Sequence, residues 1–307
     1  MHNVFTHAEL LALGRTRNEI QRLVRLGALT RLCHGVYAFS VPDAPELQHR
    51  QLVAACRRTI GSDKVTSHVS AAVLHGIPVP RRDLRRATFT SLGAEHGSSN
   101  KHVIIRATAL ALDDVVDVEG NPTTSLVRTA ADVARTQHSM GWAVATLDAA
   151  LRLGATPTEV EHMLDKHERL QGRPQGLSAL RLASPLAESP LESLSRVHML
   201  LAGFPPPKEQ VDLHDEQGFV GRIDFLWPDE GIAGEADGMM KFDELLADGE
   251  TATDRVRRMH RRDQRLLALG YLPVHWGWDD AQTPQAMQRV LQPAFREARR
   301  RLLRSSA

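Results

Sequence analysis

The sequence predicts an α+β protein with more than one domain. Its 307 residues exceed the roughly 150 of a typical domain, so two domains are expected, or three small ones. Helix-start signals and a hairpin pattern occupy the first part, and helical and strand patterns share the rest. Proline-containing breaks at Ser184-Pro185 and Ser189-Pro190 mark a boundary. We expect domains at residues 1–44, 45–186 and 187–307.

The composition is that of a soluble globular protein. Hydrophobic residues make up 42% and charged residues 24%, which excludes a disordered or fibrous chain. No apolar run approaches the roughly 18 residues of a membrane span, and the N-terminus lacks the pattern of a secretory signal. Cys33 and Cys56 are too few for a disulfide framework or a structural zinc site. We therefore expect a cytoplasmic protein without a membrane partner.

Two capping boxes open the first domain. Residues 6–9 and 16–19 both read Thr-x-x-Glu, in which the hydroxyl and the carboxylate satisfy backbone donors at a helix start. Gly14 separates the two apolar helical patterns, and residues 29–39 alternate around His34-Gly35 as a short hairpin does. The order of helix, turn, helix and hairpin predicts a winged helix-turn-helix.

This motif places the N-terminal part of its second helix in the major groove of DNA. Arginine pairs with guanine, and asparagine or glutamine with adenine, so the residue types present suit base readout. Basic residues on the hairpin suit phosphates or the minor groove. The candidate DNA-binding residues are Arg15, Arg17, Asn18, Gln21, Arg22, Arg25, Arg31 and His34. The alternative is a small helical cap with a solvated arginine face.

The middle region, residues 45–186, mixes helical and strand patterns. Helices are predicted over 47–60, 70–74, 125–135, 141–153, 158–170 and 175–182. Strands are predicted over 87–92 and 102–107, separated by a loop. The pattern favours a mixed α/β domain.

The last region has a different order and an uneven charge. The predicted elements are a helix over 191–202, strands over 209–214, 220–226 and 231–237, a helix over 253–269, a strand over 271–276 and a helix over 284–303. The whole chain is nearly balanced, with 38 Lys and Arg against 37 Asp and Glu. Residues 207–250, however, carry thirteen acids against three cations, and residues 251–307 carry twelve arginines against five acids. This division suggests a cation-gathering site beside a surface that tolerates phosphate.

Two carboxylates in the acidic segment are candidates for metal chemistry. Asp224 and Glu235 fall on neighbouring predicted strands, with ten residues between them for a short turn and a return strand. Converging carboxylates suit Mg²⁺, which polarises a phosphodiester and lowers the pKa of its bound water. Glu192, early in the preceding helix, would project into the same site.

The N-terminal half resembles a known family. Phe5-Thr-His-Ala-Glu-Leu, the stretch from Arg22 to Leu32 and His34-Gly-Val-Tyr resemble the winged-helix domain of AbiEi-family antitoxins. Residues 65–78 and 122–132 resemble the segments that follow it in actinobacterial members. These antitoxins are transcriptional autorepressors of type IV toxin–antitoxin operons. The resemblance implies a regulator that needs no cofactor, with double-stranded DNA as its partner and a cognate toxin or its operon as a candidate further partner. Winged-helix regulators often dimerise to read paired half-sites, so a homodimer is a second candidate.

Residues 190–278 resemble the restriction-endonuclease-like PD-(D/E)XK superfamily, and within it domains related to very-short-patch-repair endonucleases. The resemblance includes Glu192, Asp224-Phe, Glu235-Ala-Asp-Gly and the stretch around Asp263. It implies an α/β domain in which Asp224 and Glu235 are metal ligands. The superfamily's usual lysine, two residues after the second carboxylate, is Asp237 here, and the nearby Lys241 would have to move into the site.

Two hypotheses follow. The first is a DNA-binding regulator of antitoxin type, with the nuclease-like domain kept as an inactive, DNA-holding or dimerising module. The second is a Mg²⁺-dependent DNA endonuclease targeted by its winged helix, with Asp224 and Glu235 as catalytic residues and Glu192 or Lys241 assisting. In the simplest interpretation of the acidic segment, Asp237-Gly238 only ends a strand. The missing lysine favours the regulator.

Overall fold

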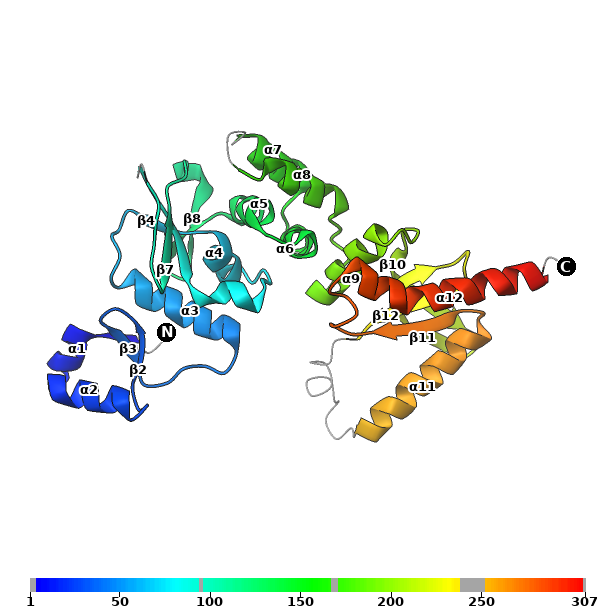
Figure 1. The fold of residues 1–307 in the computed structure, drawn as a ribbon, viewed down its shortest axis with the longest axis horizontal. Coiled ribbons are helices and arrows are strands. Elements are labelled where there is room, and N and C mark those ends of the chain that lie inside the picture. Colours follow the sequence, from blue (N-terminus) through cyan, green and yellow to red (C-terminus); the bar gives the residue numbers. More distant parts are fainter. Residues whose placement is uncertain (1–3, 94–95, 167–170, 238–251, 306–307) are drawn as a thin grey trace. The chain divides into compact units, whose positions relative to one another are not determined.

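A computed structural model describes residues 4–93, 96–166, 171–237 and 252–305. The chain divides into two compact units. The first consists of Met1–Gln137 and Leu153–Leu180, and the second of His138–Arg152 and Arg181–Ala307. Each unit contains helices and β-sheet (Figure 1), which confirms a mixed α and β protein with more than one unit.

The first unit begins with two short helices and a three-stranded sheet in the order β1-β3-β2. Their bounds are β1 Val4–Thr6, α1 His7–Ala12, α2 Arg17–Arg25, β2 Thr30–Cys33 and β3 Val36–Ala38. Both predicted capping boxes are confirmed, because the hydroxyls of Thr6 and Thr16 accept from the backbone N–H groups of Glu9 and Glu19 at 3.2 Å. Three buried aliphatic side chains form the small core, Leu10, Ile20 and Leu29.

The same unit contains a six-stranded sheet in the order β6-β7-β5-β4-β9-β8. Its strands are β4 Lys64–Thr66, β5 Ala87–Ser91, β6 Ser98–Ser99, β7 Val103–Arg106, β8 Val115–Val118 and β9 Asn121–Thr124. The sheet is mixed, since β4 pairs antiparallel with β5 and parallel with β9.

The helices that follow α2 in this unit are α3 Pro45–Arg57, α4 His68–Leu74, α5 Leu126–Thr136, α7 Pro157–Lys166 and α8 Arg173–Leu182, with short 3-10 turns at η1 Arg81–Arg85 and η2 Leu112–Asp114. Helices α3 and α4 contact the sheet. Helix α3 joins the N-terminal elements to the sheet through one apolar cluster, in which Cys33 of β2 and Cys56 of α3 are buried beside Phe89 of β5. Both cysteines are free thiols.

The second unit is built on a four-stranded sheet in the order β10-β11-β12-β13. Its elements are α6 Met140–Arg152, α9 Pro190–Leu201, β10 Lys208–Asp215, β11 Gly218–Trp227, β12 Ile232–Ala236, α11 Ala252–Ala268, β13 Leu272–Trp276 and α12 Pro284–Ser305. The first three strands pair antiparallel, whereas β13 runs parallel to β12. The parallel pair requires a crossover, and α11 lies within it.

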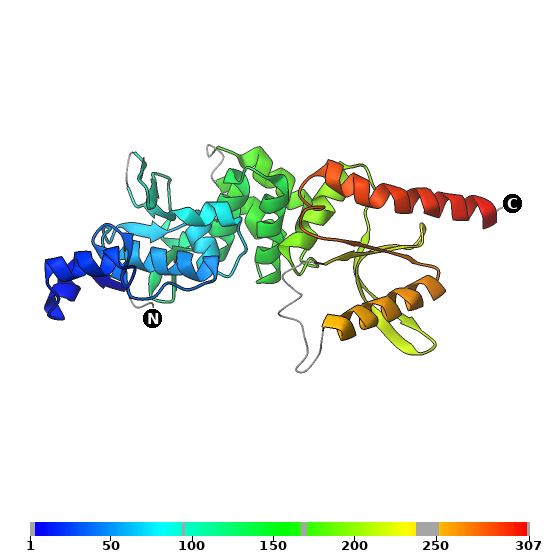
Figure 2. The same ribbon diagram turned by 60° about the horizontal axis from the view of Figure 1, so that its bottom comes forward.

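Helices cover both faces of this sheet. Helix α11 lies on one side and α12 on the other (Figures 1 and 2). On the α12 side, Trp227 and Trp276 pack with Met287 in the larger core cluster. On the α11 side, Leu266 packs against Ile223. No helix in the described ranges combines the length and the apolar composition needed to cross a bilayer.

Helix α6 belongs to the second unit, although it falls within the middle region of the sequence. Its Asp148 accepts a hydrogen bond from Arg196 of α9 at 2.7 Å, and both side chains are buried. Arg196 also pairs with Glu209 of β10 at 2.5 Å. Because buried charges are stable only when paired, these contacts hold α6, α9 and the sheet together. The predicted domain boundaries at 44 and 186 stay predictions.

Candidate functional site

Helix α2 carries the predicted DNA-reading side chains on one exposed face. At about 100° per residue, positions 17, 18, 21, 22 and 25 span an arc of roughly 140°. Ile20 and Leu23 point to the opposite side, where Ile20 is buried in the core. All six predicted residues on and before this helix are exposed: Arg15, Arg17, Asn18, Gln21, Arg22 and Arg25.

The hairpin that follows α2 carries Arg31 and His34, and both are exposed. Arg31 Nη2 lies 3.1 Å from His34 Nδ1, and Arg31 Nε donates to the Cys33 carbonyl oxygen at 3.3 Å. The two residues predicted to contact phosphate therefore lie side by side at the tip of the hairpin.

In the second unit, β11 and β12 bring Asp224 and Glu235 together. The antiparallel register pairs Phe225 with Gly234, so the next residues along each strand, Asp224 and Glu235, oppose each other. The backbone N–H of Ala236 donates to Asp224 Oδ2 at 2.9 Å, which holds this carboxylate against β12. The expected turn and return strand thus produce the expected neighbours.

Gln210 of β10 links Glu192 to this pair. Its Nε2 donates to Glu192 Oε2 at 2.9 Å and to Asp224 Oδ1 at 3.0 Å. Glu192 is fixed at the start of α9, where it accepts from Ser189 Oγ at 2.7 Å. The φ of Gln210 is 54°, a left-handed conformation that is uncommon for a residue with a Cβ. Three predicted catalytic residues, Glu192, Asp224 and Glu235, are thus gathered at one place with a glutamine that the sequence analysis missed.

Glu235 has a cationic partner from α11. Its side chain is nearly buried, and Arg262 Nη2 lies 2.5 Å from Glu235 Oε1. Burial raises the pKa of Glu235 to about 8; the carboxylates of Asp224 and Asp237 act in the same direction, and Arg262 limits the rise. Arg262 is one of twelve arginines in the basic segment, so its position in the sequence alone does not mark it as the partner of Glu235.

Asp237 follows β12 at the position where the resemblance calls for lysine, and it pairs with His275 of β13. His275 Nδ1 lies 2.7 Å from Asp237 Oδ2, and His275 Nε2 lies 3.1 Å from Asp263 Oδ1. The hydrogen bond with Asp237 raises the pKa of His275 to about 9, and Asp263 adds to the rise, so the ring is largely protonated at neutral pH. Lys241 lies outside the described residues.

A groove of about 610 Å³ opens beside Asp237 and His275. Five arginines contribute to its lining, Arg222, Arg258, Arg261, Arg262 and Arg265. Some of this charge is neutralised locally, since Arg222 pairs with Glu188 and Arg265 pairs with Asp215. The basic segment therefore lies next to the acidic one, and its guanidinium groups suit phosphate oxygens.

The carboxylates as arranged do not form a ready Mg²⁺ site. This ion demands near-octahedral oxygen ligands. The oxygens of Asp224 already accept hydrogen bonds from Gln210 and Ala236, and Glu235 faces a guanidinium. Within the described residues, no group of three or more His, Cys, Asp or Glu could hold a metal ion. A divalent ion would have to displace these partners, and the metal-ligand roles of Asp224 and Glu235 stay predictions.

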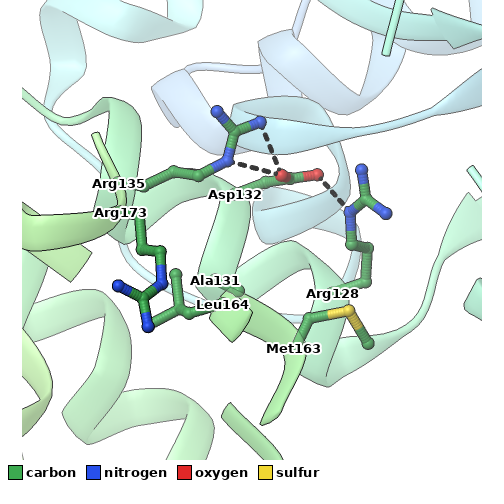
Figure 3. Close-up of a pocket in the computed structure, with 7 residues that line it drawn as sticks. All are labelled: Arg128, Ala131, Asp132, Arg135, Met163, Leu164 and Arg173. Carbon is green, nitrogen blue, oxygen red and sulfur yellow. Dashed lines mark hydrogen bonds and ion pairs between the residues drawn. The ribbon is translucent and has the colours of Figure 1, made fainter. Parts of the chain in front are cut away.

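The first unit contains a buried ion-pair network that the sequence analysis did not anticipate. Asp132 lies between Arg128 and Arg135, with a distance of 2.8 Å to each (Figure 3). Burial acts to raise the pKa of Asp132, but its positive neighbours lower it to about 2. The cavity beside the network, about 10 Å³, has room for a single water molecule. The network pairs Arg128 and Asp132, both of which lie in the segment 122–132.

His68 lies near this network at the start of α4. It is 2% exposed, its φ is 51°, and its Nδ1 lies 3.1 Å from Ser67 Oγ. Its Nε2 makes no hydrogen bond with any described residue. Burial lowers the pKa of His68 to about 3, so the ring is neutral at physiological pH.

Comparison with known proteins gives a family match at the N-terminus. Residues 1–40, which contain α1, α2 and the three-stranded sheet, match the family described as "Transcriptional regulator, AbiEi antitoxin". The match covers the α2 face and the hairpin described above, and it supports the antitoxin-like interpretation of this segment. It does not extend to the carboxylate site.

Similarities that cover more of the chain are to proteins of Mycobacterium tuberculosis. The crystal structure of the RV2827C protein from Mycobacterium tuberculosis has a TM-score of 0.40 and 17% sequence identity, over 69% of this chain and 83% of that chain. Two relatives from the same species are 31% identical over 221 residues, which is 72% of this chain and 78% of theirs. They are named "Uncharacterized protein MT2308" (strain CDC 1551 / Oshkosh) and "Uncharacterized protein Rv2248" (strain ATCC 25618 / H37Rv). The chain belongs to the same family as these two proteins of Mycobacterium tuberculosis.

Proposed function

We propose that the protein is a DNA-binding transcriptional regulator of the AbiEi antitoxin type, with a winged helix-turn-helix as its first domain. The observation that carries this proposal is the exposed face of α2, which combines arginines with an asparagine and a glutamine. The family match of residues 1–40 supports it. The partners in this proposal are double-stranded operon DNA, a cognate toxin and a second copy of the chain.

In this proposal, α2 enters the major groove. Arg17, Asn18 and Gln21 contact base edges, because they occupy the N-terminal half of the helix. Arg22 reads a further base or a phosphate, and Arg31 on the hairpin contacts the flanking backbone. Phosphate contacts release counterions, so the affinity should fall as salt concentration rises.

Titration of labelled DNA from the upstream region tests the proposal. Replacing both Arg17 and Arg22 with alanine should weaken binding at least about 30-fold, since each lost contact costs about 1–3 kcal/mol. The matched control replaces Arg296 and Arg299 of α12 with alanine. Both arginines are exposed, and their replacement removes the same amount of charge from the second unit. Wild-type affinity in the α2 variant would show that the assigned reading helix is wrong.

A second candidate is a Mg²⁺-dependent endonuclease of the PD-(D/E)XK superfamily. The observation that favours it is the gathering of Glu192, Asp224 and Glu235 around Gln210. The same titration, run with Mg²⁺ and with a chelator, scores cleavage alongside the shift. Mg²⁺-dependent cleavage that Asp224→Asn abolishes would make the protein an enzyme, whereas a shift without cleavage in both conditions supports the regulator.

A further inference from the structure

One guanidinium contacts both strands that carry the carboxylate pair. Arg262 Nη2 lies 2.5 Å from Glu235 Oε1 on β12, and it donates to the Arg222 carbonyl oxygen on β11 at 2.9 Å. Glu235 is only 5% exposed, so little water screens its interaction with Arg262. Arg262 therefore places a positive charge, supplied by the protein itself, directly against the Glu235 carboxyl group.

Gly221 makes room for this guanidinium. A Cβ at position 221 would lie 2.5 Å from Arg262 Nε and 2.8 Å from Arg262 Nη2. The φ of Gly221 is outside the left-handed region, so the backbone conformation does not itself require glycine. A larger side chain would push the guanidinium away. The absence of a side chain at Gly221 thus allows the Arg262 guanidinium to lie against Glu235.

The neighbouring carboxylates are satisfied in a similar way. Asp224 accepts from the side chain of Gln210 and the backbone of Ala236, and Asp237 pairs with His275. These contacts come from three strands, so the folded sheet itself supplies the donors. A divalent cation entering the site would compete with all of them, and most directly with the positive charge of Arg262.

We propose that Arg262 is a built-in counter-ion that takes the place of a divalent cation at the Asp224–Glu235 pair. In the folded protein it keeps the affinity of the pair for such a cation low. Removing or displacing the guanidinium should uncover a latent cation site. This inference concerns the second unit and does not depend on DNA binding by the first.

Binding of Mn²⁺ to the full-length protein tests the proposal, followed by electron paramagnetic resonance of the free ion at a pH at which Glu235 is ionised. Arg262→Met should bind Mn²⁺ at least tenfold more tightly than the wild type. Gly221→Ala keeps the arginine but displaces its guanidinium, and should shift the affinity in the same direction. Arg261→Met is the matched control, because Arg261 is exposed and directs its Nε to the Arg257 carbonyl oxygen. Its affinity should equal that of the wild type.

The double variant Arg262→Met with Asp224→Asn should lose the gained affinity, which would assign the ion to the carboxylate pair. The proposal would be overturned if the wild type bound Mn²⁺ as tightly as Arg262→Met does and lost that binding in Asp224→Asn. Arg262 would then not exclude the ion. Absence of binding by an Arg262→Met protein with a normal circular-dichroism melt would overturn it as well. If Arg262→Met does not fold, an unchanged Mn²⁺ affinity in Gly221→Ala decides against the proposal.

Discussion

At the residue scale, backbone strain coincides with polar side chains that converge. His68 and Gln210 have φ values of 51° and 54°, and neither is a glycine. Such conformations cost about 1–3 kcal/mol and persist only where the surroundings enforce them. His68 lies in a buried polar environment, and Gln210 bridges two carboxylates. Both positions are therefore informative sites for substitution.

Gln210→Ala should destabilise the second unit by about 1–3 kcal/mol, since Glu192 and Asp224 lose their shared donor and the strain remains. Gln210→Gly removes the same donor but relieves the strain, so its loss should be smaller by about 1 kcal/mol. Urea unfolding of the two variants measures the difference. Equal losses would mean that the φ of 54° has no energetic cost.

His68 should make the stability of the first unit depend on pH. Its pKa is about 3 in the folded protein and near the ordinary value of 6.5 in the unfolded chain. Between these values only the unfolded chain binds the proton, so stability is full above pH 6.5 and falls by about 1.4 kcal/mol per pH unit as pH decreases.

His68→Asn, which tolerates a positive φ, should remove this dependence. Between pH 7 and pH 5, the free energy of unfolding should fall by about 2 kcal/mol more in the wild type than in this variant. The comparison cancels other titrating groups, such as the buried His49. An identical fall in both proteins would show that His68 accepts a proton in the folded state.

At the scale of elements, α1 and α2 offer an internal comparison, because both begin with the same capping box. Thr6→Ala and Thr16→Ala should each cost about 1 kcal/mol of stability. Under the proposed function, only Thr16→Ala should also weaken DNA binding, by several-fold, because it frays the start of the reading helix. Thermal unfolding and DNA titration of the two variants provide the test. Equal DNA affinities of the two variants would mean that the N-terminal cap of α2 does not contribute to DNA binding.

Elements with strong local signals were predictable, even where they are as short as α1, β2 and β3. The capping boxes located α1 and α2, and ten-residue spacing placed Asp224 beside Glu235. Strands β1, β4, β8 and β9, of three or four residues each, were not predicted. Their conformation depends on pairing with partners elsewhere in the chain.

The side chains around the carboxylates illustrate the same limit. Gln210, Arg262 and His275 acquire their roles through strand register and the crossover helix, which no local pattern encodes. One signal was available: Asp237 in the place of the expected lysine leaves the site rich in negative charge. That excess requires a cation from elsewhere, and the basic segment was the evident source.

At the scale of the whole molecule, two compact units share one chain that passes from one to the other more than once. The buried pair of Asp148 and Arg196 makes α6 an integral part of the second unit. Asp148→Ala should destabilise that unit by about 2–4 kcal/mol, because Arg196 keeps only Glu209 as a carboxylate partner.

The effect should be confined to the second unit. Denaturation of Asp148→Ala should be followed by tryptophan fluorescence and by DNA binding. All four tryptophans lie in the second unit, so the fluorescence should change at a lower denaturant concentration than in the wild type. DNA binding should be lost at the same denaturant concentration as in the wild type. A parallel loss of both signals would mean that the two units unfold as one.

Because the crossover between β12 and β13 is long, the carboxylates of the second unit are synthesised well before the cations that pair with them. Strands β10, β11 and β12 are joined by short connections and can pair soon after they leave the ribosome. Arg262 follows Glu235 by 27 residues, and His275 follows Asp237 by 38. The nascent chain therefore carries its carboxylates before it has made the cations that neutralise them. During that interval the growing sheet is an acidic surface, and the arrival of α11 and β13 removes that excess of charge.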